Sequence, residues 1–458
     1  MFKRSFHITA AKRYILKKPQ FDVKQIISNI PDYEKSILHR EMVNSKNIIN
    51  DLKTLPKNYQ SYQSLNKDLI SIQQKRHVLE STLQLAKNSS SITNANGEIE
   101  DIDTEKIKEQ LLNLKTEYQN ISSTLKDLET TINEICNNLP NLIDPSAPKN
   151  EAVIVKWLNP KESYSLDRER DHVKIMKAKK MINFQSAVDI TGSSWYFLTN
   201  EGADLERALI SYAIDKAKRR EFGLVIPPAV VKNEIINACG FRPRDMGNEK
   251  QIYHIKDTDF GLIATAEIPL AGMYVNSILD LSKGPLRHVG ISRSYRSEAG
   301  ARGKDTKGLY RVHEFSKVEL FTWSKPSDST EQLQYLKNVQ CDIIGSLGIS
   351  AKMLNMPTND LGASAYLKCD IEAWMPGRGS FGELSSVSNC RDYQSRRLHI
   401  KYKNESTGKF EHVHTLNGTA MAVPRVMMTL VENYYNKTTG RIDIPTCLRP
   451  YMNNRSYI

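Results

Sequence analysis

The chain has 458 residues, 40% hydrophobic and 25% charged, which is enough for two or three globular domains with their own cores. Its formal net charge of +12 suits a polyanionic partner, and no run of about 18 apolar residues exists that could form a membrane-spanning helix. The six cysteines form no C-x-x-C pair, which argues against a disulfide framework or a thiolate zinc site and favours free thiols in a reducing compartment.

The first twenty residues are basic and contain no acidic residue. They hold six lysine and arginine side chains, together with hydroxyl residues and interspersed apolar residues. This composition is typical of a mitochondrial transit peptide, and the alternative is a disordered basic tail. We therefore expect residues 1–20 to direct the chain to the mitochondrial matrix, and their removal would halve the formal charge to +6.

Two segments carry apolar residues at heptad spacing. The first is interrupted only by an arginine and comprises Leu65, Leu69, Ile72, Arg76, Leu79 and Leu83. The second is unbroken and comprises Ile107, Leu111, Leu114, Tyr118, Ile121, Leu125, Leu128, Ile132 and Ile135. The polar stretch between them, residues 88–105, reverses the chain. The pattern predicts an antiparallel coiled-coil arm over residues 57–135, within an N-terminal domain of residues 21–140. Each of its two helices would have about 30 residues and a length of about 45 Å.

The charge of this arm leaves its partner open. Residues 57–87 carry five basic side chains against two acidic ones, whereas residues 105–135 carry four against six. A heptad segment serves either dimerisation or RNA binding. An RNA would be held mainly by the first helix, or by its shape.

The sequence pattern changes after the arm. Residues 141–169 are rich in proline without periodicity, which indicates a linker. Residues 170–458 alternate between short strands and helices, which predicts an α+β domain with a mainly antiparallel sheet. One helix is expected to end at Gly223, with an apolar face of Leu205, Ala208, Leu209 and Tyr212. Pro227 and Pro228 then interrupt a strand, which suits a sheet edge or an interface.

Gly377, Gly379 and Gly382 match the G-x-G-x-x-G pattern of a dinucleotide-binding loop. That loop requires a helix to open directly after the glycines. Here the residues on both sides alternate with the period of a strand, so we interpret the glycines as a hairpin turn. Any nucleotide in this region must bind by other means.

A basic hairpin is predicted over residues 289–321. It presents Arg296 and Arg311 from opposite strands, and the loop between them carries Arg302, Lys304 and Lys307. Guanidinium groups fork onto phosphate oxygens, so a pair of arginines on a sheet makes a triphosphate site without a glycine loop. The alternative is a surface hairpin with solvated charges.

Two further segments complete the pattern. The stretch LIATAEIPL places Thr265 and Glu267 beside an apolar strand, and TLNGTAMAVPR passes from a strand into a helix with Pro424 in its first turn. Taken in order, these segments resemble the class II aminoacyl-tRNA synthetases, and within them the seryl-tRNA synthetases. The resemblance covers nearly the whole chain after residue 20, with Pro228 in motif 1, residues 295–315 as motif 2 and TLNGTAMAVPR as motif 3.

The resemblance implies a function. Such an enzyme activates L-serine with ATP and Mg²⁺ and transfers serine to tRNA(Ser) in mitochondrial translation. It also implies that tRNA(Ser) is bound by the coiled-coil arm and the motif 2 loop, and that a homodimer forms through the region around Pro228. No general base is required, because the serine carboxylate is already a nucleophile for the α-phosphorus.

The resemblance also implies site residues. ATP is expected at Arg296, Ser297, Glu298, Arg311, Val312, Phe315, Glu383, Leu384, Ser385, Ser386 and Arg425. Serine is expected at Thr265, Ala266, Glu267, Arg296, Glu319, Asn417 and Thr419. The catalytic set is Arg296, Glu298, Arg311 and Arg425, and the oxygen ligands for Mg²⁺ are Glu383 and Ser386. We assign structural roles to the histidines of this region, His288, His313, His412 and His414.

Few positions depart from the family pattern. Lys307 stands where arginine is common, and Arg302 where a small or apolar residue is frequent, so contacts to the tRNA acceptor stem are in doubt. Two alternatives remain: an aminoacylating relative that acts on a carrier protein, which would lack the arm, and an inactive paralogue that binds RNA or protein, which would lose motif residues.

Overall fold

The computed structural model describes residues 16–42, 44–88, 91–93, 99–101, 103–241, 252–298 and 308–458. Two compact units divide these residues: one comprises 21–37 and 44–139, and the other comprises 16–20, 38–42 and 140–458. Most of the expected transit peptide, and the motif 2 loop with Arg302, Lys304 and Lys307, lie outside the described residues. Within the described chain no helix is long and apolar enough to cross a membrane.

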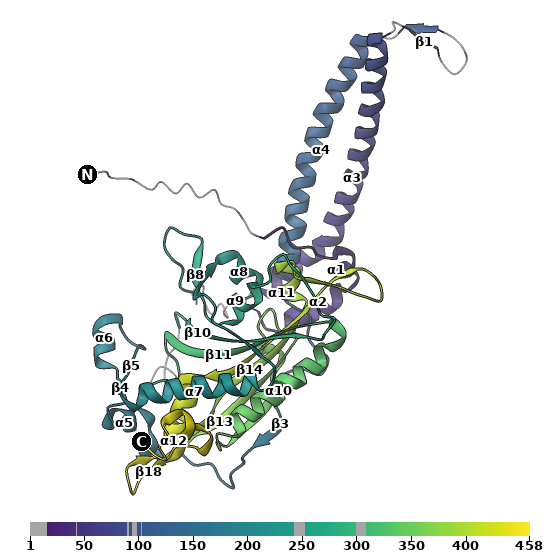
Figure 1. The fold of residues 1–458 in the computed structure, drawn as a ribbon. Coiled ribbons are helices and arrows are strands. Elements are labelled where there is room, and N and C mark those ends of the chain that lie inside the picture. The colour runs from purple at the N-terminus through teal and green to yellow at the C-terminus, as the bar shows by residue number, and fades with distance from the viewer. Residues whose placement is uncertain are drawn as a thin grey trace, which may run out of the picture. The chain divides into compact units, whose positions relative to one another are not determined.

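The N-terminal helical unit is dominated by two long helices, α3 (Ser45–Asn88) and α4 (Thr104–Asn138), which pack along each other (Figure 1). Short helices precede them, α1 (Val23–Ser28) and α2 (Ile30–His39). The strands β1 (Ser91–Thr93) and β2 (Ile99–Asp101) pair in the connection. At 1.5 Å per residue, α3 is about 66 Å long and α4 about 52 Å, so both exceed the predicted arms.

The predicted heptad positions form the seam between these helices. Ile72, Leu125, Ile132 and Ile135 are buried, and the remaining heptad positions are half-buried. Arg76, the interruption in the pattern, lies over the ring of Tyr118 at 5.8 Å. The arginine therefore continues the seam by a cation–π contact rather than breaking it.

The larger unit is built on one eight-stranded sheet, in the order β3-β12-β13-β14-β17-β11-β10-β6. All neighbouring strands are antiparallel except β10 and β6, which confirms the predicted α+β class with a mainly antiparallel sheet. In that order the strands span Val153–Leu158, Ala351–Asn355, Leu367–Met375, Ser380–Arg391, His414–Ala422, Glu314–Ser324, Leu286–Tyr295 and Gly223–Val225.

Helices cover both faces of this sheet and enclose two cores (Figure 1). Strand β11 serves both, because Val318 and Leu320 belong to one core and Phe321 and Trp323 to the other. The first core is covered by α7 (Glu201–Lys218), α10 (Ser329–Gly345) and α12 (Val423–Tyr434). The second is covered by α8 (Asn233–Ala238), α9 (Glu267–Gly272) and α11 (Tyr393–Leu398).

Smaller elements complete the unit. Two more helices are α5 (His172–Ala178) and α6 (Gln185–Thr191). Short paired strands are β4 (Ile182–Asn183), β5 (Phe197–Leu198), β7 (Val230–Lys232), β8 (Phe260–Leu262), β9 (Ile278–Leu279), β15 (Lys401–Lys403), β16 (Phe410–His412), β18 (Tyr435–Asn436) and β19 (Arg441–Ile442). The 3-10 turns are η1 (Arg168–Arg170), η3 (Pro326–Asp328), η4 (Thr358–Asp360) and η5 (Thr446–Met452).

Two expected boundaries differ from the structure. Residues 141–169, predicted as a linker, contribute β3, which pairs with β12 at the edge of the main sheet. The helix expected to end at Gly223 ends at Lys218, and Gly223 instead opens β6. Glu221, three residues after the last helical residue, takes the left-handed conformation, at φ 62°, that often ends a helix.

The glycine-rich segment is a hairpin, as predicted, because β13 and β14 pair across it. Gly379 sits in the turn with φ 72°. Gly382, however, lies inside β14 opposite Ala373 and is not a turn residue. A Cβ at Gly382 would stand 2.8 Å from Met375 and 2.9 Å from Tyr310, so close packing explains this glycine.

Candidate active site

A pocket opens on the sheet where the hairpin of β10 and β11 meets β14 and the first turn of α12. It has about 540 Å³ of empty space. Its lining residues are Arg296, Glu298, Leu309, Tyr310, Arg311, Val312, Phe315, Lys317, Glu383, Leu384, Ser386, Thr419, Ala422, Pro424 and Arg425. Residues of motif 2, of the strand after Gly382 and of motif 3 therefore converge on one cavity.

Arg425 and Glu383 form the ion pair at one wall. Arg425 lies in the first turn of α12, directly after Pro424, and its Nη1 donates to Glu383 Oε2 at 3.0 Å. Burial disfavours the carboxylate, but the charges of Arg425, Lys368 and Arg296 and the hydrogen bond from Arg425 together outweigh burial and lower the pKa of Glu383 to about 2. The carboxylate of Glu383 is thus ionised at neutral pH and can serve as an oxygen ligand for a cation.

Arg296 follows β10 directly and lies half-buried in the same pocket. Its guanidinium carbon lies 5.3 Å from the ring centre of Phe315, and its Nε donates to the carbonyl of Ala264 at 3.4 Å. Burial, and then the charge of Arg425, lower the pKa of Arg296. Two guanidinium groups that repel each other in one cavity favour a polyanionic ligand between them.

A deeper layer of buried polar groups lies beside Lys317. Its Nζ is 2.5 Å from Glu319 Oε2 and donates to Thr265 Oγ1 at 3.1 Å. The Thr265 hydroxyl in turn donates to Glu319 Oε2 at 3.2 Å. Thr419 stands opposite Glu319 on β17, so acceptors from three elements meet here.

Glu267, at the start of α9, is the second carboxylate of this layer. Gln394 Nε2 donates to its Oε1 at 2.7 Å, and Gln394 is itself oriented by the hydroxyl of Thr415, which donates to Gln394 Oε1 at 2.7 Å. Burial, reinforced by the charge of Glu319, raises the pKa of Glu267 to about 7. Without a ligand, this carboxylate is therefore half-protonated near neutral pH.

The structure separates the predicted site residues into two groups. Those lining the cavity are Arg296, Glu298, Arg311, Val312, Phe315, Glu383, Leu384, Ser386, Thr419 and Arg425. Those outside its lining are Thr265, Ala266, Glu267, Ser297, Glu319, Ser385 and Asn417. Of the second group, Ser385 is buried and donates to the Thr419 carbonyl at 2.6 Å, and Asn417 donates to Cys390 Sγ at 3.5 Å.

Sequence reasoning missed three residues of the site: Lys317, Tyr310 and Gln394. Lys317 had a signal, because it precedes Glu319 by two in a predicted strand and so shares its face. Tyr310 and Gln394 had none, since a loop residue and a helix residue are placed only by tertiary contacts. The structural role assigned to the histidines stays a prediction. His414, for example, is half-buried, and burial lowers its pKa to about 4.

The donor set at β14 fits a hard cation. Glu383 is ionised, Ser386 offers a hydroxyl, and both line the cavity that holds the two arginines. Carboxylate and hydroxyl oxygens together with phosphate oxygens are the ligands Mg²⁺ prefers. Across the described residues, no cluster of three or more histidine, cysteine or acidic side chains could hold a metal by itself, so a ligand would have to complete the coordination.

Comparison with known proteins gives one consistent family. Residues 252–434 match the tRNA synthetase class II core domain (G, H, P, S and T). The chain is 49% identical to a mitochondrial serine–tRNA ligase of Saccharomyces cerevisiae over the full length of both, and 40% identical to a serine–tRNA ligase of Dictyoglomus turgidum over 84% of this chain and 90% of that one.

Solved structures agree. The seryl-tRNA synthetase of Pyrococcus horikoshii, solved with ATP, superposes with a TM-score of 0.82 at 28% identity, covering 96% of this chain and 99% of the other. From its sequence, its fold and these relatives, the chain belongs to the seryl-tRNA synthetase family of class II aminoacyl-tRNA synthetases.

Proposed function

We propose that this enzyme activates L-serine with ATP and transfers the seryl group to tRNA(Ser) in mitochondria. The observation that carries the proposal is the convergence of Arg296, Arg425 and Glu383 on one cavity. Beside it lie two acceptors, the buried Glu319 and the half-buried Glu267. A triphosphate suits the first set, and an ammonium group and a hydroxyl suit the second. Because these charged groups remain assembled, nothing in the site favours an inactive paralogue.

In the first reaction, the serine carboxylate attacks the α-phosphorus of ATP, and pyrophosphate leaves. Arg296 is positioned to neutralise the carboxylate and the α-phosphate, and Arg425 the outer phosphates. Phe315 and Val312 supply an apolar wall for the adenine. Mg²⁺ held by Glu383 and Ser386 would add charge neutralisation at the phosphates. In the second reaction a ribose hydroxyl at the tRNA 3′ end attacks the seryl carbonyl, and AMP leaves.

Serine selectivity follows from the deeper layer. The hydroxyls of Thr265 and Thr419, with the carboxylate of Glu319, can bond a substrate hydroxyl. An amino acid that lacks the hydroxyl would leave these buried groups unpaired, which a polar site rejects strongly.

We also propose which parts of the chain bind tRNA(Ser) and where in the cell the enzyme acts. The paired helices α3 and α4 bind tRNA(Ser), since a long rod can reach features of RNA shape far from the acceptor end. The motif 2 loop contacts the acceptor end. A basic leader within residues 1–20 and the mitochondrial relative of yeast support a matrix location.

Pyrophosphate exchange across the amino acids tests the proposed function. We expect exchange with serine, at least 100-fold weaker exchange with alanine, as for other sites that bond a hydroxyl, and loss of exchange in Glu383→Ala with the fold intact by circular dichroism. Equal exchange with serine, threonine and alanine would contradict the assignment. Full activity of Glu383→Ala at low Mg²⁺ would remove Glu383 from the metal site.

A further inference from the structure

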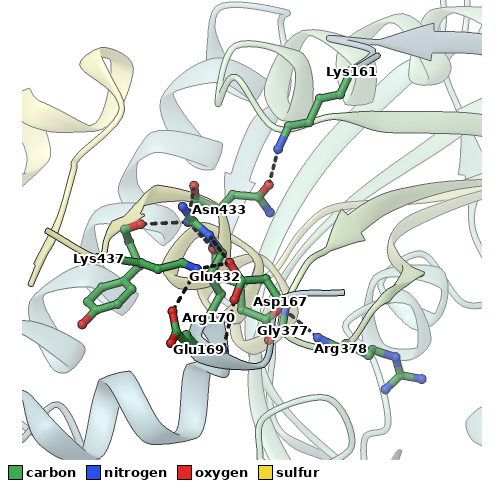
Figure 2. A network of polar contacts seen from close by, with 10 residues as sticks. Lys161, Asp167, Glu169, Arg170, Gly377, Arg378, Glu432, Asn433 and Lys437 are labelled. Carbon is green, nitrogen blue, oxygen red and sulfur yellow. Dashed lines mark hydrogen bonds and ion pairs between the residues drawn. The ribbon is translucent and has the colours of Figure 1, made fainter. Parts of the chain in front are cut away.

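Glu432 sits at the C-terminal end of α12, the helix whose first turn carries Arg425. Its side chain is 1% exposed. One oxygen, Oε2, accepts the backbone N–H of Gly377 at 2.8 Å and of Arg378 at 3.3 Å. The other, Oε1, lies 2.8 Å from Nδ1 of His172. This buried carboxylate therefore contacts the turn between β13 and β14 (Figure 2) and, through His172, joins it to the start of α5.

The end of that helix is held firmly in place. Arg170 donates from Nη1 to the carbonyl oxygens of Glu432, Asn433 and Tyr435, at 3.0, 3.2 and 2.8 Å (Figure 2). Asp167 pairs with Arg170 at 3.3 Å and with Lys437 at 2.7 Å. Carbonyl groups at a helix C-terminus lack partners within the helix, and Arg170 supplies them. Glu432 is thus a fixed point rather than a mobile side chain.

His172 continues the connection toward the active site. Its Nε2 lies 3.2 Å from the backbone N–H of Leu309 and accepts its hydrogen bond. A ring nitrogen that accepts cannot carry the proton, so the proton is on Nδ1, where it donates to Glu432. The hydrogen bonds on its two sides therefore select one neutral tautomer of His172.

Gly308 makes this approach possible. Its φ is +73°, and a Cβ at this position would collide with His172 Nε2. Any other residue would push the imidazole away from the Leu309 amide.

Leu309 leads directly into the wall of the ATP pocket, since Leu309, Tyr310, Arg311 and Val312 all line it. The Tyr310 carbonyl accepts from Arg425 Nε at 3.2 Å, and the guanidinium carbon of Arg425 lies 4.6 Å from the centre of the Tyr310 ring. The chain that exits the motif 2 loop is therefore tied to both ends of α12: through His172 and Glu432 at one end, and through Tyr310 and Arg425 at the other.

We infer that His172 is a positioning residue for ATP. It holds the Leu309 amide, and through it the segment 309–312, at the position where Arg311 and Val312 meet the nucleotide. The inference rests on the proposed function, because it takes this cavity as the ATP site. The serine-binding layer of Thr265, Lys317 and Glu319 lies outside the connection, so the effect should be selective for ATP.

Two substitutions separate the two sides of the imidazole. In His172→Asn the amide nitrogen can still donate to Glu432, but no atom remains where Nε2 accepted from Leu309. In His172→Gln the amide oxygen can reach the Nε2 position and accept from Leu309. We expect His172→Asn to raise the KM for ATP about tenfold, the worth of one positioning hydrogen bond, with the KM for serine unchanged. We expect His172→Gln to restore most of the ATP affinity.

Hydrogen exchange gives a readout that is independent of catalysis. Protection of the amides in peptides covering 308–312 should fall in His172→Asn and return in His172→Gln. If both KM values change together, if the two variants behave alike, or if His172→Asn leaves exchange protection and the KM for ATP unchanged, the inference is overturned. Should His172→Asn not fold, His172→Gln carries the test: near wild-type ATP affinity supports the role of the acceptor, and a tenfold loss refutes it.

Failure of the proposed function would look different. In that case the wild-type enzyme would show no serine-dependent exchange at all.

Discussion

Glu383 and Glu267 are both half-buried carboxylates, yet their pKa values move in opposite directions. Glu383 faces Arg425 across 3.0 Å, and despite partial burial the charges of Arg425, Lys368 and Arg296 together lower its pKa to about 2. Among the described residues the amide of Gln394 donates to the side chain of Glu267, and burial together with the charge of Glu319 raises the pKa of Glu267 to about 7. Glu383 is therefore ionised at neutral pH and can bind a cation before substrate arrives. Glu267 is expected to be fully ionised only when a positively charged ammonium group binds beside it.

This difference predicts a pH-dependent affinity for serine. Since the pKa of Glu267 is raised, lowering the pH from 8 to 6 protonates it and removes the acceptor for the ammonium group. We expect the KM for serine to rise about tenfold from pH 8 to 6, because about nine-tenths of the carboxyl is protonated one unit below its pKa. Steady-state exchange kinetics measure this directly.

Glu267→Gln is the matched control, because an amide of the same shape cannot titrate. It should bind serine weakly with a KM that no longer depends on pH over this range. A wild-type KM for serine that stays constant between pH 6 and 8 would show that Glu267 is not the group that meets the ammonium.

Among the elements, α3 and α4 differ from the rest of the protein because they have a single seam. Heptad positions such as Ile72 and Leu125 are buried, and the outer faces are exposed and charged. Their contacts are made with each other, so the outer part of the hairpin can be removed without disturbing the sheet. Arg76 of α3 contacts the ring of Tyr118 of α4, so the two helices still pack together at this height of the hairpin.

Replacing residues 77–117 with a short glycine-serine turn should therefore separate tRNA binding from chemistry. Serine-dependent exchange should stay within twofold of wild type, and charging of tRNA(Ser) at subsaturating concentration should fall at least 100-fold, as expected when many phosphate contacts are lost. Wild-type charging should also weaken as salt rises. If the truncated enzyme charges tRNA(Ser) as efficiently as the wild type, α3 and α4 do not bind tRNA, and the heptads would instead serve dimerisation.

The segment of residues 16–20 leads to a prediction about processing. The backbone N–H of Leu16 approaches Glu234 at 3.4 Å, His399 Nε2 lies 3.0 Å from the Lys17 carbonyl, and Lys401 donates to Gln20 at 2.9 Å. These residues group with the catalytic unit. Because these contacts begin at Leu16, we expect a transit peptide to be cut before Leu16. N-terminal sequencing of the mature protein checks this, and a mature start at Phe21 would contradict it.

At the scale of the whole molecule, the sheet ends in β6 at one edge, and apolar side chains are exposed around it. Ile226 is 80% exposed, and Leu224, Val230, Ile255 and Phe260 are exposed to a lesser degree. Pro227 and Pro228 follow the strand and cannot donate backbone hydrogen bonds. A cluster of this kind beside a sheet edge indicates a protein interface, which supports a homodimer through the Pro228 region.

Ile226→Asp should therefore shift the enzyme toward a monomer of 52.2 kDa, as measured by light scattering, whereas the wild type should have twice that mass. Exchange activity should fall with it if the interface braces the site. Val155→Asp is the matched control, because Val155 is also exposed but lies on β3, at the opposite edge of the sheet. A wild-type monomer that still charges tRNA would refute the dimer.

The sequence by itself determined the elements whose signal is periodic or local. The heptads specified the paired helices, because burial repeats every three or four residues along a helix. Alternation specified β13 and β14 and excluded a dinucleotide loop at Gly377. The order of the motifs identified the family, and ten of the predicted site residues line one cavity.

Only the tertiary structure decided which groups face each other. Residues 141–169 looked like a linker because an edge strand has few neighbours and needs little hydrophobic alternation, yet β3 pairs with β12. The pKa values of Glu267 and Glu383 depend on charges more than 40 residues away in the chain. His172 bonds both Leu309 and Glu432, which lie in two other segments of the chain. The local sequence cannot predict these hydrogen bonds, because only the tertiary fold brings the three segments together.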